Sequence, residues 1–472
     1  MDNASRSSIA PRPDILLIVC DQLRYDCIGS SRGRPVKTPH MDAIARGGLR
    51  FSNAFTPQPL CCPARQSLLT ARRPERDGFL WNHDIALKIP SMAPGELLWP
   101  RRLSEAGYGM VYAGKWHESE SHDPTAFGYD AYDDDADYSA YREGKYGPAH
   151  FNGAIDGEID PIPAADSHTH WLARRAGDRL SELATDSRPW HLRVDFREPH
   201  PPYLPSPEFA RLYDPGDIPA WESFREEFIN KPYIQKQMLY TWGIEDYDWT
   251  RWSAIVARYY ASVSQFDDAV GYIMDALERS GRADNTLVVL TTDHGDMCGA
   301  HRMVDKHNVL YDDIVHVPLL MKWPRVLRAG AEIGAFVQNT LDVGPTLLEA
   351  AGLPALEISD GRSLFTLFGG DIPDGWRDCA VSTYNGQQFG LYTQRMLRDS
   401  EWKYIWNTAD IDELYNLRED PAELTNRVYD PSCAETLKVL RRRLHDILVR
   451  EGDGLLKSYW TRNQLLGVTR KL

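Results

Sequence analysis

The segment Cys61-Cys62-Pro63-Ala64-Arg65 combines a nucleophilic side chain with a local structure that stabilises negative charge. Proline favours the first turn of a helix, and residues 66–70 can continue that turn. We therefore expect Cys61 just before a helix N-terminus, where free backbone amides and the helix dipole favour an anion. Arg65 adds a fixed cation one turn further on. The alternative is structural, with two buried, apolar cysteines preceding a capped helix.

Other titratable side chains follow the segments that are expected to form strands. Residues 15–20 are six apolar residues in a row, which is typical of a strand buried on both faces of a parallel sheet. Ligands of open α/β sheets bind beyond the carboxyl ends of the strands, so the residues that follow the strands are expected to meet at one edge. The expected strands and these residues are 15–20 with Asp21 and Gln22, 110–113 with Lys115 and His117, 190–196 with His200, and 286–290 with Asp293 and His294.

Helical patterns separate these strands and predict the fold class. Residues 97–107, 167–184 and 253–281 carry apolar side chains at helical spacing, and strands alternating with helices imply a parallel sheet. We predict an α/β domain over residues 1–374, with a large, mainly parallel, doubly wound sheet flanked by helices. Short strands and a final amphipathic helix at 434–449 predict a smaller C-terminal α+β domain over 375–472, with a short antiparallel sheet.

Two segments are interpreted as insertions. The aspartate-rich segment 129–138 is interpreted as a solvated loop. The segment 215–251 is rich in tryptophan and tyrosine, and we expect it to pack over the sheet. The alternative is that its aromatic side chains form a wall on which a sugar or an aromatic leaving group stacks.

Composition excludes several classes of partner. Lys and Arg number 53 against 68 Asp and Glu, and the resulting charge of −15 argues against a nucleic-acid or membrane-surface binder. Seven scattered cysteines fit no small disulfide framework, and the N-terminal residues show no signal-peptide pattern, so we expect a cytoplasmic protein. The apolar, basic tail 455–472 suits contact with a second copy of the chain, which allows a homo-oligomer.

The chain resembles the type I sulfatases of the alkaline phosphatase superfamily. The family hallmark Cys-x-Pro-Ser/Ala-Arg matches residues 61–65, and Ala71 replaces the glycine that usually follows the threonine of the motif. Matches in family order cover most of the chain, at 19–22, 114–117, 199–202, 293–296 with Lys306, 342–346, 360–364 and 413–417. In this family a formylglycine-generating enzyme oxidises the first cysteine of the motif, which implies Cys61 rather than Cys62.

The resemblance also implies a metal site and roles for the remaining residues. Asp21, Gln22, Asp293, His294 and the residue-61 side chain would hold one divalent cation. The mostly oxygen shell suits Ca²⁺ or Mg²⁺, with Ca²⁺ preferred, and the imidazole leaves Mn²⁺ or Zn²⁺ open. Gln22 replaces the commoner aspartate, which lowers the charge of the site by one. A zinc cluster of His294, His301 and His307 fits no strong zinc-ligand spacing.

The implied reaction is hydrolysis of a sulfate monoester, of a carbohydrate or an aryl alcohol, to the alcohol and inorganic sulfate. One hydroxyl of the hydrated aldehyde would attack sulfur, and the other would expel sulfate as the aldehyde reforms. Charge would be neutralised by Arg65, Lys115 and Lys306, the leaving alkoxide would be protonated by His200 with Lys306, and His117 would act as the base.

Two alternative functions stay open. A formylglycine-dependent phosphonate monoester or phosphodiester hydrolase shares the nucleophile, a Gln22-like ligand and the Asp-His pair, but Lys115 and His117 match the sulfatase pattern. An inactive sulfate-binding homologue would result if Cys61 is never oxidised. Cys298, in the loop after Asp293, is unusual and has no assigned role.

Overall fold

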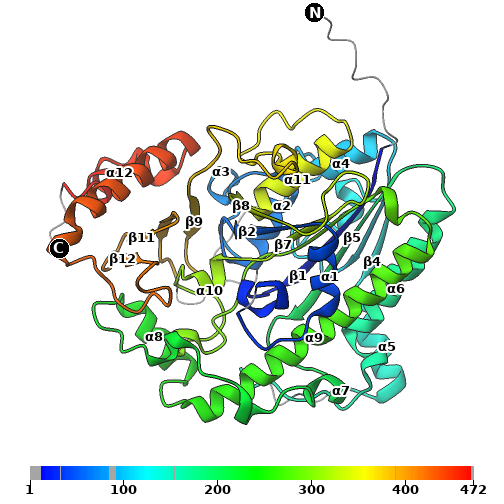
Figure 1. The fold of residues 1–472 in the computed structure, drawn as a ribbon, viewed down its shortest axis with the longest axis horizontal. Coiled ribbons are helices and arrows are strands. Elements are labelled where there is room, and N and C mark those ends of the chain that lie inside the picture. Colours follow the sequence, from blue (N-terminus) through cyan, green and yellow to red (C-terminus); the bar gives the residue numbers. More distant parts are fainter. Residues whose placement is uncertain are drawn as a thin grey trace, which may run out of the picture.

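A large mixed sheet and a small antiparallel sheet organise the protein, seen here in a computed structural model that describes residues 12–31, 33–83, 92–149, 151, 155–387 and 390–468 (Figure 1). The large sheet has eight strands in the order β4-β3-β5-β1-β6-β7-β2-β8. Only β7 runs antiparallel to its neighbours in this sheet, β6 and β2. The strands are β1 (Asp14–Asp21), β2 (Leu49–Phe55), β3 (Gly109–Gly114), β4 (Ala131–Asp134), β5 (Trp190–Pro199), β6 (Thr286–Thr292), β7 (Leu319–Lys322) and β8 (Ala331–Gln338).

Helices cover both faces of the large sheet, which confirms the predicted α/β class. Leu16 and Ile18 of β1 belong to one apolar core with α1, α6 and α9, whereas Ile15 and Leu17 belong to another with α4 and α11. Neither face of β1 meets solvent, and this explains its unbroken apolar run. The α-helices of this part of the chain are α1 (Pro39–Gly47), α2 (Cys61–Thr70), α3 (Pro74–Asp77), α4 (Trp99–Glu105), α5 (Asp137–Tyr146), α6 (His168–Ala184), α7 (Pro207–Ala210), α8 (Tyr233–Trp242), α9 (Trp249–Arg279), α10 (Asp312–Val315) and α11 (Asn339–Ala350).

The solvated loop predicted for residues 129–138 is wrong. Residues 131–134 form the edge strand β4, which pairs with β3. Asp133 is buried because Arg179 donates two hydrogen bonds to it, at 2.8 Å each. An aspartate-rich segment can thus join a sheet when arginines from a neighbouring helix neutralise it.

The inserted segment 215–251 packs against the rest of the molecule. It contains two short 3₁₀ turns and the helix α8, and Trp249 begins α9. Trp221 is buried and its indole nitrogen donates to the carbonyl oxygen of Cys298 at 2.7 Å. The segment is therefore mainly a packing element, as expected.

The small sheet and α12 (Ala434–Glu451) lie together at one end of the molecule (Figure 1). The sheet consists of β9 (Ala380–Tyr384), β10 (Gln394–Arg398), β11 (Trp402–Asn407) and β12 (Glu413–Asn416). β9 was not predicted, and Tyr392 precedes β10 rather than lying in a strand. The domain boundary between residues 374 and 375 stays a prediction.

β9 is joined directly to the loop that precedes α2. The Thr383 amide donates to the carbonyl oxygen of Pro57 at 2.8 Å, and the Ser382 hydroxyl donates to that of Thr56 at 2.6 Å. The last described helix, α13 (Tyr459–Leu465), buries Leu465 against its own chain while leaving Trp460 exposed. Among the described residues, no helix combines the length and apolar character needed to span a membrane.

Candidate active site

Cys61 is presented by the first turn of a helix that is buried along its whole length. It is the first residue of α2, one position further into the helix than the sequence predicts, and Leu60 precedes it in extended conformation. The amide of Cys62 is already used, because it donates to the Asn82 side chain at 2.9 Å. Ala71, with a φ of 55°, ends the helix in the left-handed conformation that the usual family glycine would adopt without strain.

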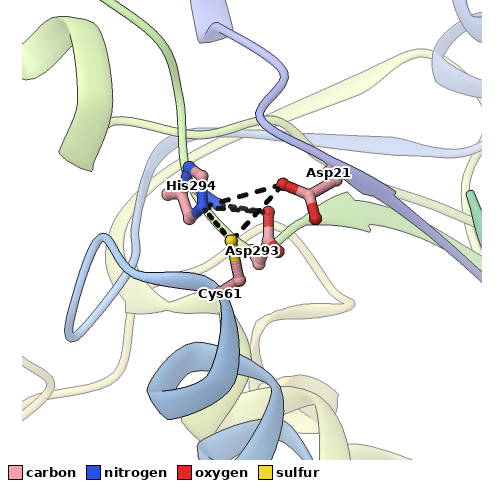
Figure 2. A group of neighbouring side chains, drawn as sticks. All are labelled: Asp21, Cys61, Asp293 and His294. Atoms are coloured by element: carbon pink, nitrogen blue, oxygen red, sulfur yellow. Dashed lines mark hydrogen bonds and ion pairs between the residues drawn. The ribbon is translucent and has the colours of Figure 1, made fainter. Parts of the chain in front are cut away.

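Four side chains from three separate elements converge on one point (Figure 2). One ligand atom from each of Asp21, Cys61, Asp293 and His294 lies within 4.8 Å of the other three. The Cys61 Sγ is 3.3 Å from His294 Nε2, which in turn is 3.7 Å from an oxygen of each aspartate. His294 Nδ1 donates to the Gly295 carbonyl oxygen at 2.9 Å, so Nε2 is turned toward the cluster.

This cluster fits one divalent cation. All four residues are buried, and they bring two carboxylates, one imidazole and the residue-61 side chain together in a place shielded from water, which is a donor set that a divalent cation accepts. Although burial opposes protonation, Asp293 and Cys61 raise the pKa of His294 to about 9. Oxygen donors with one imidazole suit several divalent ions, and the donor set does not choose among them.

Gln22 lies beside the cluster and its amide is held at both ends. Its Nε2 donates to Asp305 at 2.8 Å, and its Oε1 accepts a 2.8 Å hydrogen bond from Lys306. The Gln22 backbone amide donates to the Asp293 carboxylate at 3.1 Å. The backbone has a φ of 71°, a conformation that is uncommon for residues other than glycine.

Arg65 lies behind the cluster and faces carboxylates. Its guanidinium bonds Asp293 at 2.9 Å, Asp195 at 2.7 Å and Asp21 at 3.3 Å, and it has no exposed surface. The role implied for Arg65, neutralising charge on a substrate, therefore does not match its position. Its contacts instead orient two of the cation-binding carboxylates.

A buried chain of alternating charges continues from Arg65 to the end of β3. Asp195 bonds Arg193 at 2.6 Å, and Arg193 bonds Glu118 at 2.7 Å. Glu118 then accepts the His117 amide at 2.8 Å. Arg193 and Asp195 occupy the polar face of β5 and are fully buried, although a polar face is usually the solvated face of a strand.

The remaining predicted residues surround the Cys61 thiol. Lys115 contacts Asp21 at 2.5 Å, and Lys306 contacts His200 Nε2 at 3.0 Å. His200 Nδ1 donates to the Pro201 carbonyl oxygen at 2.6 Å, so Nε2 is the acceptor of the Lys306 proton. Although burial disfavours the thiolate, Lys306 and Lys115 hold the pKa of Cys61 well below its usual range, with help from His294 and a hydrogen bond from His117. Burial raises the pKa of Cys62 instead.

His301 and His307 lie outside the cluster, in accord with the sequence interpretation. His301 stacks on Tyr311 at a centroid distance of 4.0 Å and bonds Glu226 at 2.9 Å. His307 bonds the second oxygen of Asp305 at 2.9 Å. Neither histidine belongs to the group formed by Asp21, Cys61, Asp293 and His294.

A cavity of about 760 Å³ opens beside Lys115, His117 and His200. Three ion pairs line it, each joining a cation to a carboxylate: Arg197 with Asp135, His168 with Glu198 at 2.9 Å, and Arg142 with Asp160 at 2.9 Å. Trp116, Tyr138 and Phe151 supply aromatic surface. None of its lining residues belongs to 215–251, so this cavity gives no support to the alternative of a substrate wall in that segment.

Comparison with known proteins identifies the family. Residues 13–353, well over half of the chain, match the family model described as Sulfatase, and residues 299–450 match that of the N-sulphoglucosamine sulphohydrolase C-terminal region. The chain belongs to the sulfatase family. This sulfatase is therefore a sulfuric ester hydrolase, and the predicted resemblance is confirmed.

Relatives with different substrates resemble this sulfatase to similar degrees. A choline-sulfatase of Rhizobium meliloti is 30% identical over 89% of this chain and 83% of its own length. An arylsulfatase of Clostridium perfringens is 26% identical over 96% of this chain and 97% of its own. The solved structure of a phosphonate monoester hydrolase of Agrobacterium radiobacter is 25% identical, with a TM-score of 0.79 over 93% of this chain and 96% of that one.

Sequence reasoning missed the residues that support the site from behind. These are Asn82, Glu118, Arg193, Asp195 and Asp305. Arg193 and Asp195 could have been identified from the sequence. They are charged residues at alternate positions of an otherwise apolar strand, and such charges must be neutralised if both faces of the strand are covered. For Asn82 and Asp305 no local pattern points to a role.

Proposed function

We propose that this sulfatase hydrolyses a sulfate monoester of a saccharide to the alcohol and inorganic sulfate, with formylglycine derived from Cys61 and one divalent cation, Ca²⁺ being the first choice. The position of residue 61 carries the proposal. Its side chain meets the cation-binding carboxylates on one side, and Lys115 and Lys306 lower the pKa of its thiol from the other. An anionic headgroup placed here would meet the same two ammonium groups.

The side chains around residue 61 have different roles in the proposed reaction. When bound, the cation would polarise the sulfate and lower the pKa of a hydroxyl, and formylglycine, as a hydrate, would supply the attacking oxygen. Lys115 and Lys306 neutralise charge that develops on the sulfuryl oxygens. His200 lines the cavity and accepts a hydrogen bond from Lys306, so this pair is placed to protonate the leaving oxygen. His117, within hydrogen-bonding reach of residue 61, is placed to act as a base.

The cavity supports a saccharide as the leaving group. Its volume of about 760 Å³ lies in the upper part of the range for small-molecule sites. The three ion pairs offer donors and acceptors with little net charge, which suits hydroxyl groups better than a cationic or strongly anionic group. Tyr138 and Phe151 add aromatic surface against which a sugar ring can pack.

A phosphonate monoester hydrolase is the second candidate. Gln22, in place of an aspartate, and the 25% identity to the Agrobacterium radiobacter enzyme favour it. Lys115 and His117 at the end of β3 favour the sulfatase reaction. Turnover of an aryl sulfate against a phosphonate monoester separates the two, and a faster phosphonate reaction would establish the second candidate.

Two measurements test the proposal. An aldehyde-reactive tag followed by peptide mass analysis should label residue 61 in active protein and should not label a Cys61→Ser variant. Full activity in unlabelled protein would refute formylglycine, and labelled residue 61 excludes an inactive sulfate binder. A panel of sulfated mono- and disaccharides, aryl sulfates and choline sulfate should show the highest kcat/KM for a saccharide.

Maturation and cellular setting belong to the same proposal. Conversion of Cys61 requires a formylglycine-generating enzyme. The seven cysteines are free thiols in the structure, which supports a reducing, cytoplasmic compartment. Assembly into a homo-oligomer through the C-terminal tail stays a prediction, and residues 469–472 of that tail lie outside the described residues.

A further inference from the structure

Gln22 and Asp305 form a buried pair, and Asp305 has no role in the proposed reaction. Gln22 is fully buried and Asp305 is almost so. Asp305 Oδ1 accepts the Gln22 Nε2 proton at 2.8 Å and lies 3.1 Å from the Lys306 ammonium. The other carboxylate oxygen is held by His307 Nε2 at 2.9 Å. The carboxylate thus has a defined partner on each oxygen.

These contacts determine which end of the Gln22 amide faces which neighbour. A carboxylate accepts hydrogen bonds and an ammonium donates them, so Nε2 must face Asp305 and Oε1 must face Lys306. The reversed amide would place oxygen against carboxylate and NH₂ against ammonium. Gln22 therefore presents its oxygen to Lys306, whose ammonium interacts electrostatically with Cys61 and Asp21, while its backbone amide is bonded to Asp293.

The charges of residues 22 and 305 also affect the cation site. A glutamine brings no charge to the cation site, whereas an aspartate at position 22 would bring one. Asp305 lies in direct contact with the Gln22 side chain, so its carboxylate restores that negative charge beside the cation site. An aspartate at both positions would place two carboxylates in contact inside the protein, which is strongly unfavourable.

We propose that Asp305 is a positioning residue that orients the Gln22 oxygen as a cation ligand and supplies the negative charge that an aspartate at position 22 would otherwise provide. The inference rests on the divalent cation of the proposed function. It assigns to positions 22 and 305 a joint requirement: one amide and one carboxylate, in either order.

Direct measurement of cation binding tests this requirement without relying on turnover. Ca²⁺ binding to chelator-stripped protein is measured by calorimetry for the wild type, D305N, Q22D and the double variant Q22D/D305N. D305N is expected to bind Ca²⁺ about 10- to 100-fold more weakly, the usual cost of removing a partner of a metal ligand. The double variant exchanges amide and carboxylate, and its affinity should return to within about fivefold of the wild type.

Three further readouts separate positioning from damage to the fold. Q22D should unfold at a lower temperature than the wild type without Ca²⁺, and D305N in the same chain should relieve this. Saturating Ca²⁺ should restore most of the kcat of D305N, which a misfolded site would not allow. Asp296 is the matched control, because it is a buried carboxylate of the same loop that bonds Tyr203 at 2.6 Å, and D296N should retain Ca²⁺ affinity within about threefold.

The possible failures are distinguishable. If the wild type binds Ca²⁺ and D305N binds it equally well, the role of Asp305 is overturned while the proposed function stands. The same holds if the double variant binds no better than D305N. If wild-type protein binds no divalent cation, with Ca²⁺, Mg²⁺ and Mn²⁺ each tried, both the inference and the metal-dependent reaction are overturned.

Discussion

Two buried lysines, Lys306 and Lys231, show how similar networks of charge serve different ends. Lys306 contacts Gln22, His200 and Asp305 within 3.1 Å. Lys231 is equally buried and donates to the hydroxyls of Tyr311 and Tyr415 and to the carbonyl oxygen of Glu423, at 2.6 to 3.0 Å.

The difference lies in what the partners face. His200, a partner of Lys306, lines the large cavity, whereas the partners of Lys231 come from the loop before α10, from β12 and from the turn after it. Lys231 therefore joins the inserted segment, the large domain and the small sheet. Burial and charge alone therefore do not identify a catalytic site. A partner that lines a cavity distinguishes a lysine that can act on a substrate from one that only holds segments of the chain together.

The largest effect should come from residue 61, the thiol whose pKa Lys306 and Lys115 lower. Replacing Cys61 with alanine should lower turnover of a sulfate ester by about 10⁴-fold or more, because the attacking group is lost. The midpoint of thermal unfolding should change little. Cys62→Ala is the matched control and should keep most of the turnover, and comparable losses in both variants would contradict the assignment of Cys61.

Lys306→Ala should lower kcat/KM by about 10²- to 10³-fold, since a cation that neutralises developing charge and bonds His200 is removed. Steady-state kinetics with a saccharide sulfate checks this. If Lys306→Ala lost only stability and kept its turnover, Lys306 would be a structural lysine like Lys231, and the proposed difference between them would be contradicted.

Lys231→Met should show the opposite behaviour. The substitution keeps the apolar stem and removes the charge next to Glu226, which lies 3.3 Å away and is buried. We expect a loss of about 3 kcal/mol in the free energy of unfolding, with kcat/KM within about threefold of the wild type. Urea denaturation measures the free energy of unfolding, and steady-state kinetics on the same preparation measures kcat/KM. A large loss of turnover in folded protein would contradict the structural role of Lys231.

Per pH unit, the smallest expected effect is a pH dependence of stability from Glu423, a partner of Lys231. Burial, reinforced by Asp312 and opposed by Lys403, raises the pKa of Glu423 to about 8 from a usual 4.5. The folded chain holds this proton more tightly than the unfolded chain, so the contribution to stability is full below about pH 4.5 and is lost as the pH rises toward 8. The slope is at most about 1.4 kcal/mol per pH unit.

Glu423→Gln should flatten that slope, because the amide does not titrate. Denaturation midpoints between pH 5 and 8 check the difference between the variant and the wild type. Equal slopes in both proteins would assign the dependence to other groups.

The central strands and the residues that follow them could be predicted because their environment is uniform. β1 and β6 are buried on both faces and read as apolar runs, and topology alone brings Asp21, Asp293 and His294 to one edge. The doubly wound class follows from the same alternation of strands and helices.

Residues whose environment depends on distant segments could not be predicted. The burial of Asp133 depends on Arg179, 46 positions away, and the orientation of Gln22 depends on Asp305, 283 positions away. Arg65 was expected to face a substrate because its charge was visible in the sequence, whereas its bonds to Asp21, Asp195 and Asp293 depend on segments that are far apart in the chain. β9 escaped prediction because its short run carries no clear alternation.

The two hydrogen bonds from β9 to Thr56 and Pro57 make the start of α2 depend on residues made very late in translation. The donor of the Ser382 bond follows its acceptor by 326 positions. Most of the polypeptide must therefore be synthesised before the loop that precedes Cys61 can form these two hydrogen bonds. A shortened chain ending at residue 374 would lack both of them, so neither predicted domain should be expressed alone when the chemistry at residue 61 is studied.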